Sequence, residues 1–262
     1  MKLGLSTAAY YGQYETEDAA AHIRERFDLD CVEVFLQTRS EYNAEFGTLV
    51  RERLDGLPAT SVHPVGTAYE NFVFSRSARQ RADAMTLLCG VFDAAQAMGA
   101  GMYVYHGHHS AKGTPVTPNF ERYHDGLTCM CEQAGQRGVR ICWENVWWCV
   151  LCAPERVERV RALYPDVGFV LDIKQAMLGG HDPKAFVRAM GDRLMNVHVV
   201  DYDDTGRLCL PGQGTVDFRG FFSALRAVGY DGPVILEPYA TMFSCDEELE
   251  AAIACLRAAM VG

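Results

Sequence analysis

Short apolar runs and helix-length amphipathic stretches alternate eight times along this chain, with no low-complexity linker between them. The runs that we predict as strands are residues 2–6, 31–36, 59–63, 102–106, 139–144, 168–172, 194–199 and 233–237. The predicted helices lie near residues 16–27, 43–54, 76–98, 119–137, 154–163, 183–191, 218–228 and 246–260. Buried strands separated by amphipathic helices are typical of a parallel sheet, because each helix packs back onto the sheet.

Eight strand–helix units favour a closed (β/α)₈ TIM barrel, and 262 residues is an ordinary length for this barrel as one domain, residues 1–262. A doubly wound open sheet is the alternative fold, but no Gly-x-Gly-x-x-Gly pattern follows the first run. Binding sites of barrels are built from the loops that follow strands. The longest predicted loops all do so: residues 64–75, 106–118 and 200–217.

Composition limits the partners and the compartment. The net charge of −10 argues against a broad surface for the phosphates of a nucleic acid. No apolar run approaches the roughly 20 residues that span a bilayer, and the chain opens on a strand pattern rather than a signal region. We therefore expect a cytoplasmic protein that binds neither a membrane nor a nucleic acid. Most of the ten cysteines fall inside apolar runs, so we expect reduced thiols that are buried or inert.

Four predicted strands in the second half of the chain end on a side chain that can bind a metal ion: Glu144, Asp172, His198 and Glu237. The C-terminal ends of parallel strands lie at one face of a barrel, so these side chains should converge there. Partly buried carboxylates repel one another unless a cation neutralises them. Three carboxylates and one imidazole suit a hard or borderline divalent cation. We expect one such ion, Mn²⁺ first, with Mg²⁺, Co²⁺ or Zn²⁺ as alternatives.

These residues and their neighbours resemble the motifs of a known family. The motifs are Trp143-Glu144-Asn145, Leu171-Asp172-Ile173, His198-Val199-Val200-Asp201 and Leu236-Glu237-Pro238. Residues 211–218, Pro-Gly-Gln-Gly-Thr-Val-Asp-Phe, are similar to a stretch of its isomerase branch. The family is the xylose isomerase-like TIM-barrel superfamily, the sugar phosphate isomerases and epimerases. It includes ketose 3-epimerases, hydroxypyruvate isomerases, inosose isomerases and dehydratases and, more distantly, endonuclease IV.

The resemblance implies a metal-dependent isomerase or epimerase whose substrate is a small sugar or cyclitol. The metal would polarise a keto group, and Glu144 and Glu237 would move protons beside it through an enediolate. Asp172 and His198 would act as ligands alone. A metal-dependent lyase or dehydratase acting on an inosose or a 3-keto (C-)glycoside is the alternative. A barrel that binds sugar without catalysing a reaction is a further alternative, but the presence of both Glu144 and Glu237 argues against it. A homo-oligomer is compatible with each of these alternatives.

One departure from the family pattern narrows the choice among the activities of the family. Many relatives carry a histidine three residues after the aspartate of the sixth strand, where this chain has Gln175. A glutamine can hydrogen-bond a substrate hydroxyl but is a poor metal ligand. This argues against a third metal, and so against the AP endonuclease chemistry of endonuclease IV. His63 and His106 end the third and fourth predicted strands, and we expect them to bind substrate; a packing role or a second metal is the alternative.

Other side chains near the strand ends are candidates for the substrate pocket. Arg207 could meet a substrate oxygen, and a solvated loop arginine is the alternative. Trp147 and Phe72 could stack on the apolar face of a sugar or on an aromatic aglycone, although aromatic side chains often belong to a core. Supporting roles beside the ligands or in ion pairs are expected for three charged residues: Glu33, Lys174 and Asp201.

Overall fold

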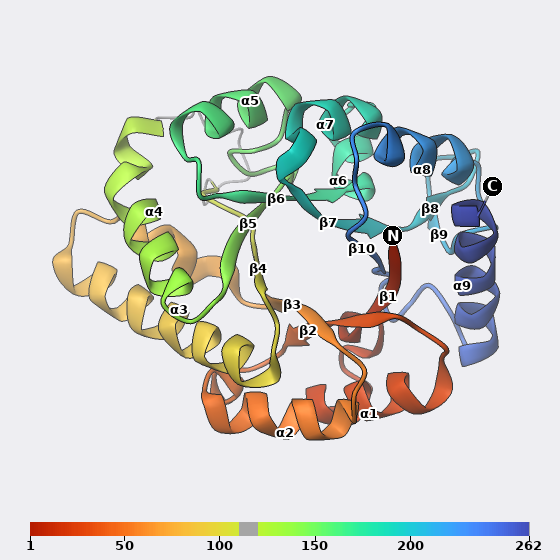
Figure 1. The fold of residues 1–262 in the computed structure, drawn as a ribbon, viewed down its shortest axis with the longest axis horizontal. Coiled ribbons are helices and arrows are strands. Elements are labelled where there is room, and N and C mark those ends of the chain that lie inside the picture. Colours follow the sequence, from red (N-terminus) through yellow and green to blue (C-terminus); the bar gives the residue numbers. More distant parts are fainter. Residues whose placement is uncertain (110–119, 262) are drawn as a thin grey trace.

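Eight parallel strands close into a barrel, and the helices pack around its outside (Figure 1). The computed structural model describes residues 1–109 and 120–261, so residues 110–118 of one predicted loop lie outside the described residues. Around the barrel the strands follow the order β1, β10, β7, β6, β5, β4, β3 and β2. Their bounds are β1 (Lys2–Ser6), β2 (Cys31–Leu36), β3 (Ala59–Pro64), β4 (Met102–Tyr105), β5 (Arg140–Glu144), β6 (Gly168–Asp172), β7 (Leu194–Val199) and β10 (Pro233–Leu236).

The helices lie where the amphipathic pattern predicts them. They are α1 (Thr16–Arg26), α2 (Ala44–Leu54), α3 (Ala78–Met98), α4 (Phe120–Gly135), α5 (Pro154–Leu163), α7 (Pro183–Met190), α8 (Phe218–Ala227) and α9 (Asp246–Val261). Each predicted strand and helix has its counterpart, and the bounds differ by at most one or two residues. The predicted (β/α)₈ barrel is therefore confirmed.

The structure also contains short elements that the sequence pattern did not indicate. α6 (Ile173–Leu178) begins directly after β6, and the Asp172 carboxylate caps it by accepting the Gln175 backbone N–H. The segment after β7 forms a hairpin of β8 (Asp201–Tyr202) and β9 (Leu208–Cys209). Four 3₁₀ helices complete the described part: η1 (Thr7–Tyr10), η2 (Arg39–Glu41), η3 (Thr67–Phe74) and η4 (Gly191–Arg193). The loops after β1, β3, β6 and β7 are thus folded segments at the C-terminal end of the barrel.

Side chains that point into the barrel change from apolar to polar along the strands. Towards the N-terminal end lies a buried apolar cluster, separate from the main core, formed by Met102, Val104, Cys142 and Val170 with Met195 against it. Residues two apart on a strand face the same side. The side chains two positions after Val104, Cys142 and Val170 are His106, Glu144 and Asp172. Inside the barrel, the polar residues at the C-terminal end therefore pack on a layer of apolar side chains.

No helix in the described part of the chain is both long and apolar enough to cross a bilayer. All ten cysteines are free thiols. Cys31, Cys142 and Cys149 are buried, and burial raises the pKa of Cys31 to about 11 and of Cys142 to about 12. Cys245 is exposed, so the expected burial does not extend to every thiol.

Candidate metal centre

The four predicted ligands come together at the C-terminal end of the barrel. Glu144 and Asp172 are the last residues of β5 and β6, His198 lies in β7, and Glu237 directly follows β10. One ligand atom from each of Glu144, Asp172 and His198 lies within 4.8 Å of the others. His198 Nδ1 lies 3.4 Å from Glu237 Oε2. The first three side chains are buried, and that of Glu237 is 12% exposed.

A buried hydrogen-bond network orients the ring of His198. Its Nε2 lies 3.0 Å from Glu33 Oε2, and the same oxygen accepts hydrogen bonds from Ser61 Oγ at 2.6 Å and Asn196 Nδ2 at 2.9 Å. A carboxylate beside Nε2 keeps a proton on that nitrogen, so a metal that displaces one proton of the charged ring would bind Nδ1. Nδ1 lies on the side of Glu144, 3.9 Å from its Oε1. Glu33 is therefore a positioning residue for the imidazole.

Three buried atoms at this place make no hydrogen bond of regular geometry among the described residues and are held by ion-pair contacts alone: Glu144 Oε2, Asp172 Oδ2 and His198 Nδ1. Buried polar atoms are normally hydrogen-bonded, so three atoms from neighbouring strands that have ion-pair contacts alone remain available to a further partner. Two carboxylate oxygens and an imidazole nitrogen, with Glu237 beside them, are ligand types that Mn²⁺, Zn²⁺ and similar ions accept. The residues present therefore fit a divalent cation.

A buried lysine shares the site. Lys174 lies in the first turn of α6, and its Nζ is 3.3 Å from both Asp172 Oδ2 and Glu237 Oε2. The same Nζ lies 4.8 Å from the centre of the Tyr239 ring. Burial would lower the pKa of Lys174, but the two carboxylates outweigh it and raise that pKa well above its usual value. The site thus contains a permanent cation where the carboxylates meet.

The carboxylates of the site differ in their protonation. Burial raises the pKa of Asp172 to about 6. Burial also acts on Glu237, but the charge of His198 outweighs it and holds the pKa of Glu237 well below its usual range. In Glu144 burial is likewise outweighed, by His106, and the pKa of Glu144 is lowered well below its usual range. Glu144 and Glu237 are therefore the carboxylates that are held ionised and able to accept a proton.

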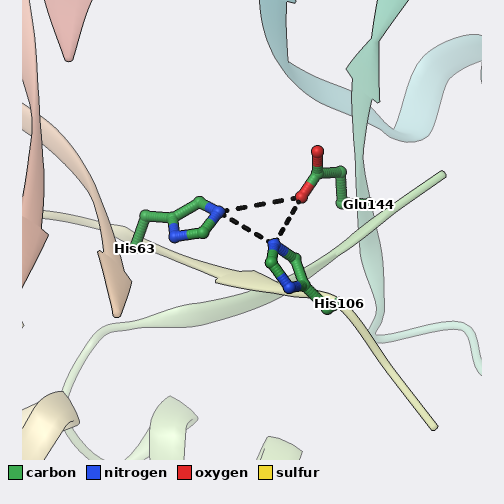
Figure 2. Close-up of side chains that lie close together, drawn as sticks. All are labelled: His63, His106 and Glu144. Atoms are coloured by element: carbon green, nitrogen blue, oxygen red, sulfur yellow. Dashed lines mark hydrogen bonds and ion pairs between the residues drawn. The ribbon is translucent and has the colours of Figure 1, made fainter. Parts of the chain in front are cut away.

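Figure 2 shows that His63 and His106 point toward the carboxylate of Glu144. His106 Nε2 lies 3.0 Å and His63 Nε2 3.8 Å from Glu144 Oε2, and the two imidazole nitrogens are 2.9 Å apart. This arrangement can pass a proton to or from Glu144, and the three side chains also form a group that could hold an ion. The backbone after His106 turns at Gly107, where φ is +82° and a Cβ would lie 2.3 Å from Trp143 Nε1. A glycine is thus required to bring His106 to this position.

A cavity of about 380 Å³ lies over these residues at the C-terminal end of the barrel. Its polar lining consists of His63, His106, Glu144, Lys174, Gln175 and Glu237. Three predicted substrate-binding residues, His63, His106 and Gln175, therefore face the same space as the two glutamates. A larger hollow of about 570 Å³ at the opposite end of the barrel contains none of the predicted site residues.

The other predicted substrate-binding residues lie outside the lining of this cavity. Phe72 in η3 and Trp147 after β5 are each 45% exposed. The Trp147 backbone N–H donates to Gln175 Oε1 at 3.4 Å, which places this tryptophan next to the cavity. Arg207 is exposed in the turn between β8 and β9, where its backbone N–H binds Asp203 Oδ1. The structure therefore does not bring Arg207 to the cavity.

Two supporting residues have roles that the sequence left open or did not indicate. Asp201, expected in a supporting role, accepts hydrogen bonds from the backbone N–H groups of Gly212, Gly214 and Val216 and so orders that loop. Asn196, which the sequence motifs do not indicate, lies two residues before His198 in a buried strand. A polar residue at that position, on the same side of the strand as a ligand, is the signal that could have found it.

Comparison with known proteins agrees with this geometry. The family model described as "Xylose isomerase-like TIM barrel" matches residues 22–259. The 3-dehydroshikimate dehydratase of Pseudomonas putida is 33% identical over 125 residues, which cover 43% of this chain and 20% of that enzyme. This chain therefore spans only a small part of that relative's length. The fructoselysine 3-epimerase of Escherichia coli O157:H7 is 23% identical over 201 residues, 74% of this chain and 73% of that protein.

Among solved structures, the D-psicose 3-epimerase of Clostridium cellulolyticum H10, determined with D-tagatose, has a TM-score of 0.80. The match covers 99% of both chains at 17% sequence identity. At this level of identity the likeness concerns the fold, and it extends over the whole barrel.

Proposed function

The chain belongs to the xylose isomerase-like TIM barrel family, and on this premise we propose that it is a divalent-metal-dependent isomerase or epimerase of a small sugar or cyclitol. The observation that carries the proposal is the convergence of Glu144, Asp172 and His198, whose buried ligand atoms lie within 4.8 Å of one another at the base of a cavity. A barrel that only binds sugar has no need of two ionised glutamates lining one cavity, as Glu144 and Glu237 do.

Glu144, Asp172, His198 and Glu237 would hold the metal, which would supply a Lewis acid that polarises a keto group of the substrate. The two glutamates come from β5 and β10, which are not neighbours in the barrel. They therefore reach the substrate from different directions. One removes the proton from the carbon next to the keto group. The other, once it has taken a proton from a neighbouring group such as His106 beside Glu144, gives that proton to the opposite face, which is epimerisation, or to the neighbouring carbon, which is isomerisation.

The surrounding residues support this proton transfer. His106, 3.0 Å from Glu144 Oε2, is placed to exchange a proton with that carboxylate. Lys174, 3.3 Å from Glu237 Oε2, keeps the second glutamate ionised and in place. His63 and Gln175 line the cavity and would hydrogen-bond substrate hydroxyls.

A dehydratase is the second candidate, favoured by the 33% identity with 3-dehydroshikimate dehydratase over 125 residues. Elimination begins with the same proton removal by Glu144 or Glu237. The electron pair then expels a hydroxyl group from the next carbon, and that hydroxyl leaves as water after taking a proton from an acid such as His106. The two reactions therefore share their residues and differ in the product. A nuclease of the endonuclease IV kind is disfavoured by Gln175, which offers no imidazole.

The test is a proton-NMR screen of ketoses, inososes and 3-keto glycosides in D₂O with the Mn²⁺-loaded protein, the metal being removed before detection. Exchange of a C–H signal with an intact skeleton indicates isomerisation or epimerisation, and alkene signals indicate elimination. We expect wild type and Glu158→Gln, an exposed control, to react, and Glu144→Gln and Glu237→Gln to be inactive. If protein purified without chelator contains no divalent ion and no added ion produces a reaction, the proposal is wrong. If Glu144→Gln or Glu237→Gln retains exchange, the replaced glutamate does not transfer the proton.

A further inference from the structure

The wall of the 380 Å³ cavity changes character from one side of the barrel to the other. One side is polar and comes from β4, β5 and the segment after β6, which are neighbours in the barrel, through His106, Glu144, Lys174 and Gln175. The other side comes from β10, β1, β2 and β3, which are also neighbours. Its side chains are apolar or aromatic, apart from His63 and Glu237, and the ring of Tyr239 also contacts Lys174 of the polar side: Ala8, Tyr11, Phe35, Val65, Pro238 and Tyr239.

The apolar side forms a continuous surface from the reacting groups to solvent. The ring of Phe35 lies 5.2 Å from that of His63, deep in the cavity, and 5.9 Å from that of Tyr11, both measured between ring centres. Tyr11 and Tyr239 are 50% and 52% exposed at the mouth. Eight of the ten exposed large apolar side chains in the described part of the chain lie in segments that follow barrel strands. Three of these eight, Tyr11, Val65 and Tyr239, line the cavity, and exposed apolar surface at a cavity marks a binding site.

A free sugar does not account for this wall. The hydroxyl groups of a sugar project around its ring, and only the face formed by C–H groups is apolar. One aromatic side chain is enough to cover that face. Here six apolar side chains from four strands line one half of the cavity. A ligand that fits both halves has a polar part against Glu144 and Lys174 and a separate apolar part against the tyrosines.

We propose that the substrate is a keto sugar or cyclitol that carries an apolar substituent, such as an aryl group. Phe35, Tyr11 and Tyr239 bind the substituent, and the keto group lies against the polar side of the cavity. This inference rests on the proposed function, because it takes the polar side as the place of reaction. The two are tested by different measurements, binding preference here and solvent exchange above, so that either can fail alone.

The experiment compares two ligands that share a ketone and differ only in the substituent, methyl and phenyl 3-keto-β-D-glucopyranoside. Their dissociation constants are measured by titration of the Mn²⁺-loaded protein, and the recovered ligand is checked by proton NMR for turnover. We expect the phenyl compound to bind about tenfold more tightly or better, because the ring removes apolar area from water. Tyr11→Ala and Tyr239→Ala should each reduce this ratio.

Tyr14→Ala is the matched control, because Tyr14 is also exposed, at 41%, and follows the same strand but does not line the cavity. It should leave the ratio unchanged. Circular dichroism confirms that the variants are folded, and Tyr239→Phe, which keeps the ring, should keep the preference. A phenyl compound that binds no better than the methyl compound, including the case in which neither binds, overturns the proposal. So does a preference that survives in both alanine variants.

Discussion

Lys174 Nζ lies 3.3 Å from Glu237 Oε2, inside the group of side chains that fits a divalent cation. The same ammonium group lies 3.3 Å from Asp172 Oδ2. The lysine therefore neutralises carboxylates that would otherwise repel one another, and it does so at atoms that a metal would use. Because two cations repel at this range, the lysine should stabilise the metal-free protein and at the same time weaken metal binding.

Lys174→Met should act in opposite directions on the two forms of the protein. Without metal, the buried carboxylates of Asp172 and Glu237 lose a partner, which costs about 3–5 kcal/mol of the free energy of unfolding. Metal affinity should rise by about tenfold or more, because a repelling charge is removed. Thermal unfolding and calorimetric titration with Mn²⁺ measure both. The control, Lys184→Met, removes a partly exposed lysine whose Nζ lies 4.0 Å from Asp217 Oδ2. If Lys174→Met binds the metal as wild type does, or more weakly, the prediction is contradicted.

Glu33→Gln should weaken metal binding without touching a ligand. The amide oxygen, held by Ser61 and Asn196, would take the place of Oε2 and is a weaker acceptor for His198 Nε2–H than a carboxylate. The proton is then held less firmly on Nε2, and the tautomer with the proton on Nδ1, the nitrogen that faces the metal site, gains population. Loss of such a supporting carboxylate typically costs about 10–100-fold in metal affinity. Titration with Mn²⁺ measures the affinity, and ¹⁵N NMR of the histidine ring identifies the tautomer. Glu25→Gln, whose side chain is 65% exposed, is the control. Unchanged affinity in Glu33→Gln would remove Glu33 from this role.

The barrel and the convergence of its strand ends could be predicted because both follow from local periodicity. Buried strands alternating with amphipathic helices define the order of elements, and the last residue of each strand then lies at a known end of the barrel. Glu144 and Asp172 are the last residues of their strands in the structure as well. The prediction of this part of the site therefore did not depend on contacts between residues distant in sequence.

The rest of the site depends on contacts that no local pattern contains. Glu33 and His198 are 165 residues apart in sequence, and their strands, β2 and β7, are separated in the barrel by β1 and β10. Their pairing follows only from barrel closure. The inward position of Lys174 depends on α6, which starts without a break after β6. Arg207 follows His198 closely in sequence, but the β8–β9 hairpin holds it in an exposed turn.

Metal removal should lower thermal stability, and Asp172→Asn should abolish this dependence. An ion at about 100 times its Kd stabilises by about 2.7 kcal/mol, roughly 5–10 °C in melting temperature for a chain of this size. Asparagine can still cap α6 by accepting the Gln175 N–H, so the helix should remain while an anionic ligand is lost.

Without metal, Asp172→Asn should be at least as stable as wild type above pH 6. The pKa of Asp172 is raised to about 6 by burial, so the wild-type carboxyl loses stability as pH rises toward that value. Scanning calorimetry with EDTA or Mn²⁺ measures both effects. Asp192→Asn, whose side chain is 80% exposed, should keep the Mn²⁺-dependent rise, and the same rise in Asp172→Asn would show that Asp172 is no ligand.

Glu70 should make the stability of the protein depend on pH near neutrality. Its side chain is fully buried in η3, accepts a hydrogen bond from Tyr103 Oη at 2.6 Å, and has its pKa raised by burial to about 7. A carboxyl whose pKa is higher in the folded than in the unfolded protein binds its proton more tightly when folded. Stability is therefore greatest at low pH and is lost as pH rises from about 4.5 to 7. The full loss is roughly 3 kcal/mol, at about 1.4 kcal/mol for each pKa unit.

Glu70→Gln removes this ionisation and keeps one oxygen that can accept the Tyr103 hydrogen bond. Relative to wild type, the variant should become progressively more stable between pH 5 and pH 8, as measured by urea unfolding at each pH. For Glu155→Gln, at an exposed position, the free energy of unfolding should change with pH as it does in wild type over the same range. A constant difference between Glu70→Gln and wild type would mean that Glu70 does not titrate in this interval, and that its carboxylate is paired by a positive charge such as His106.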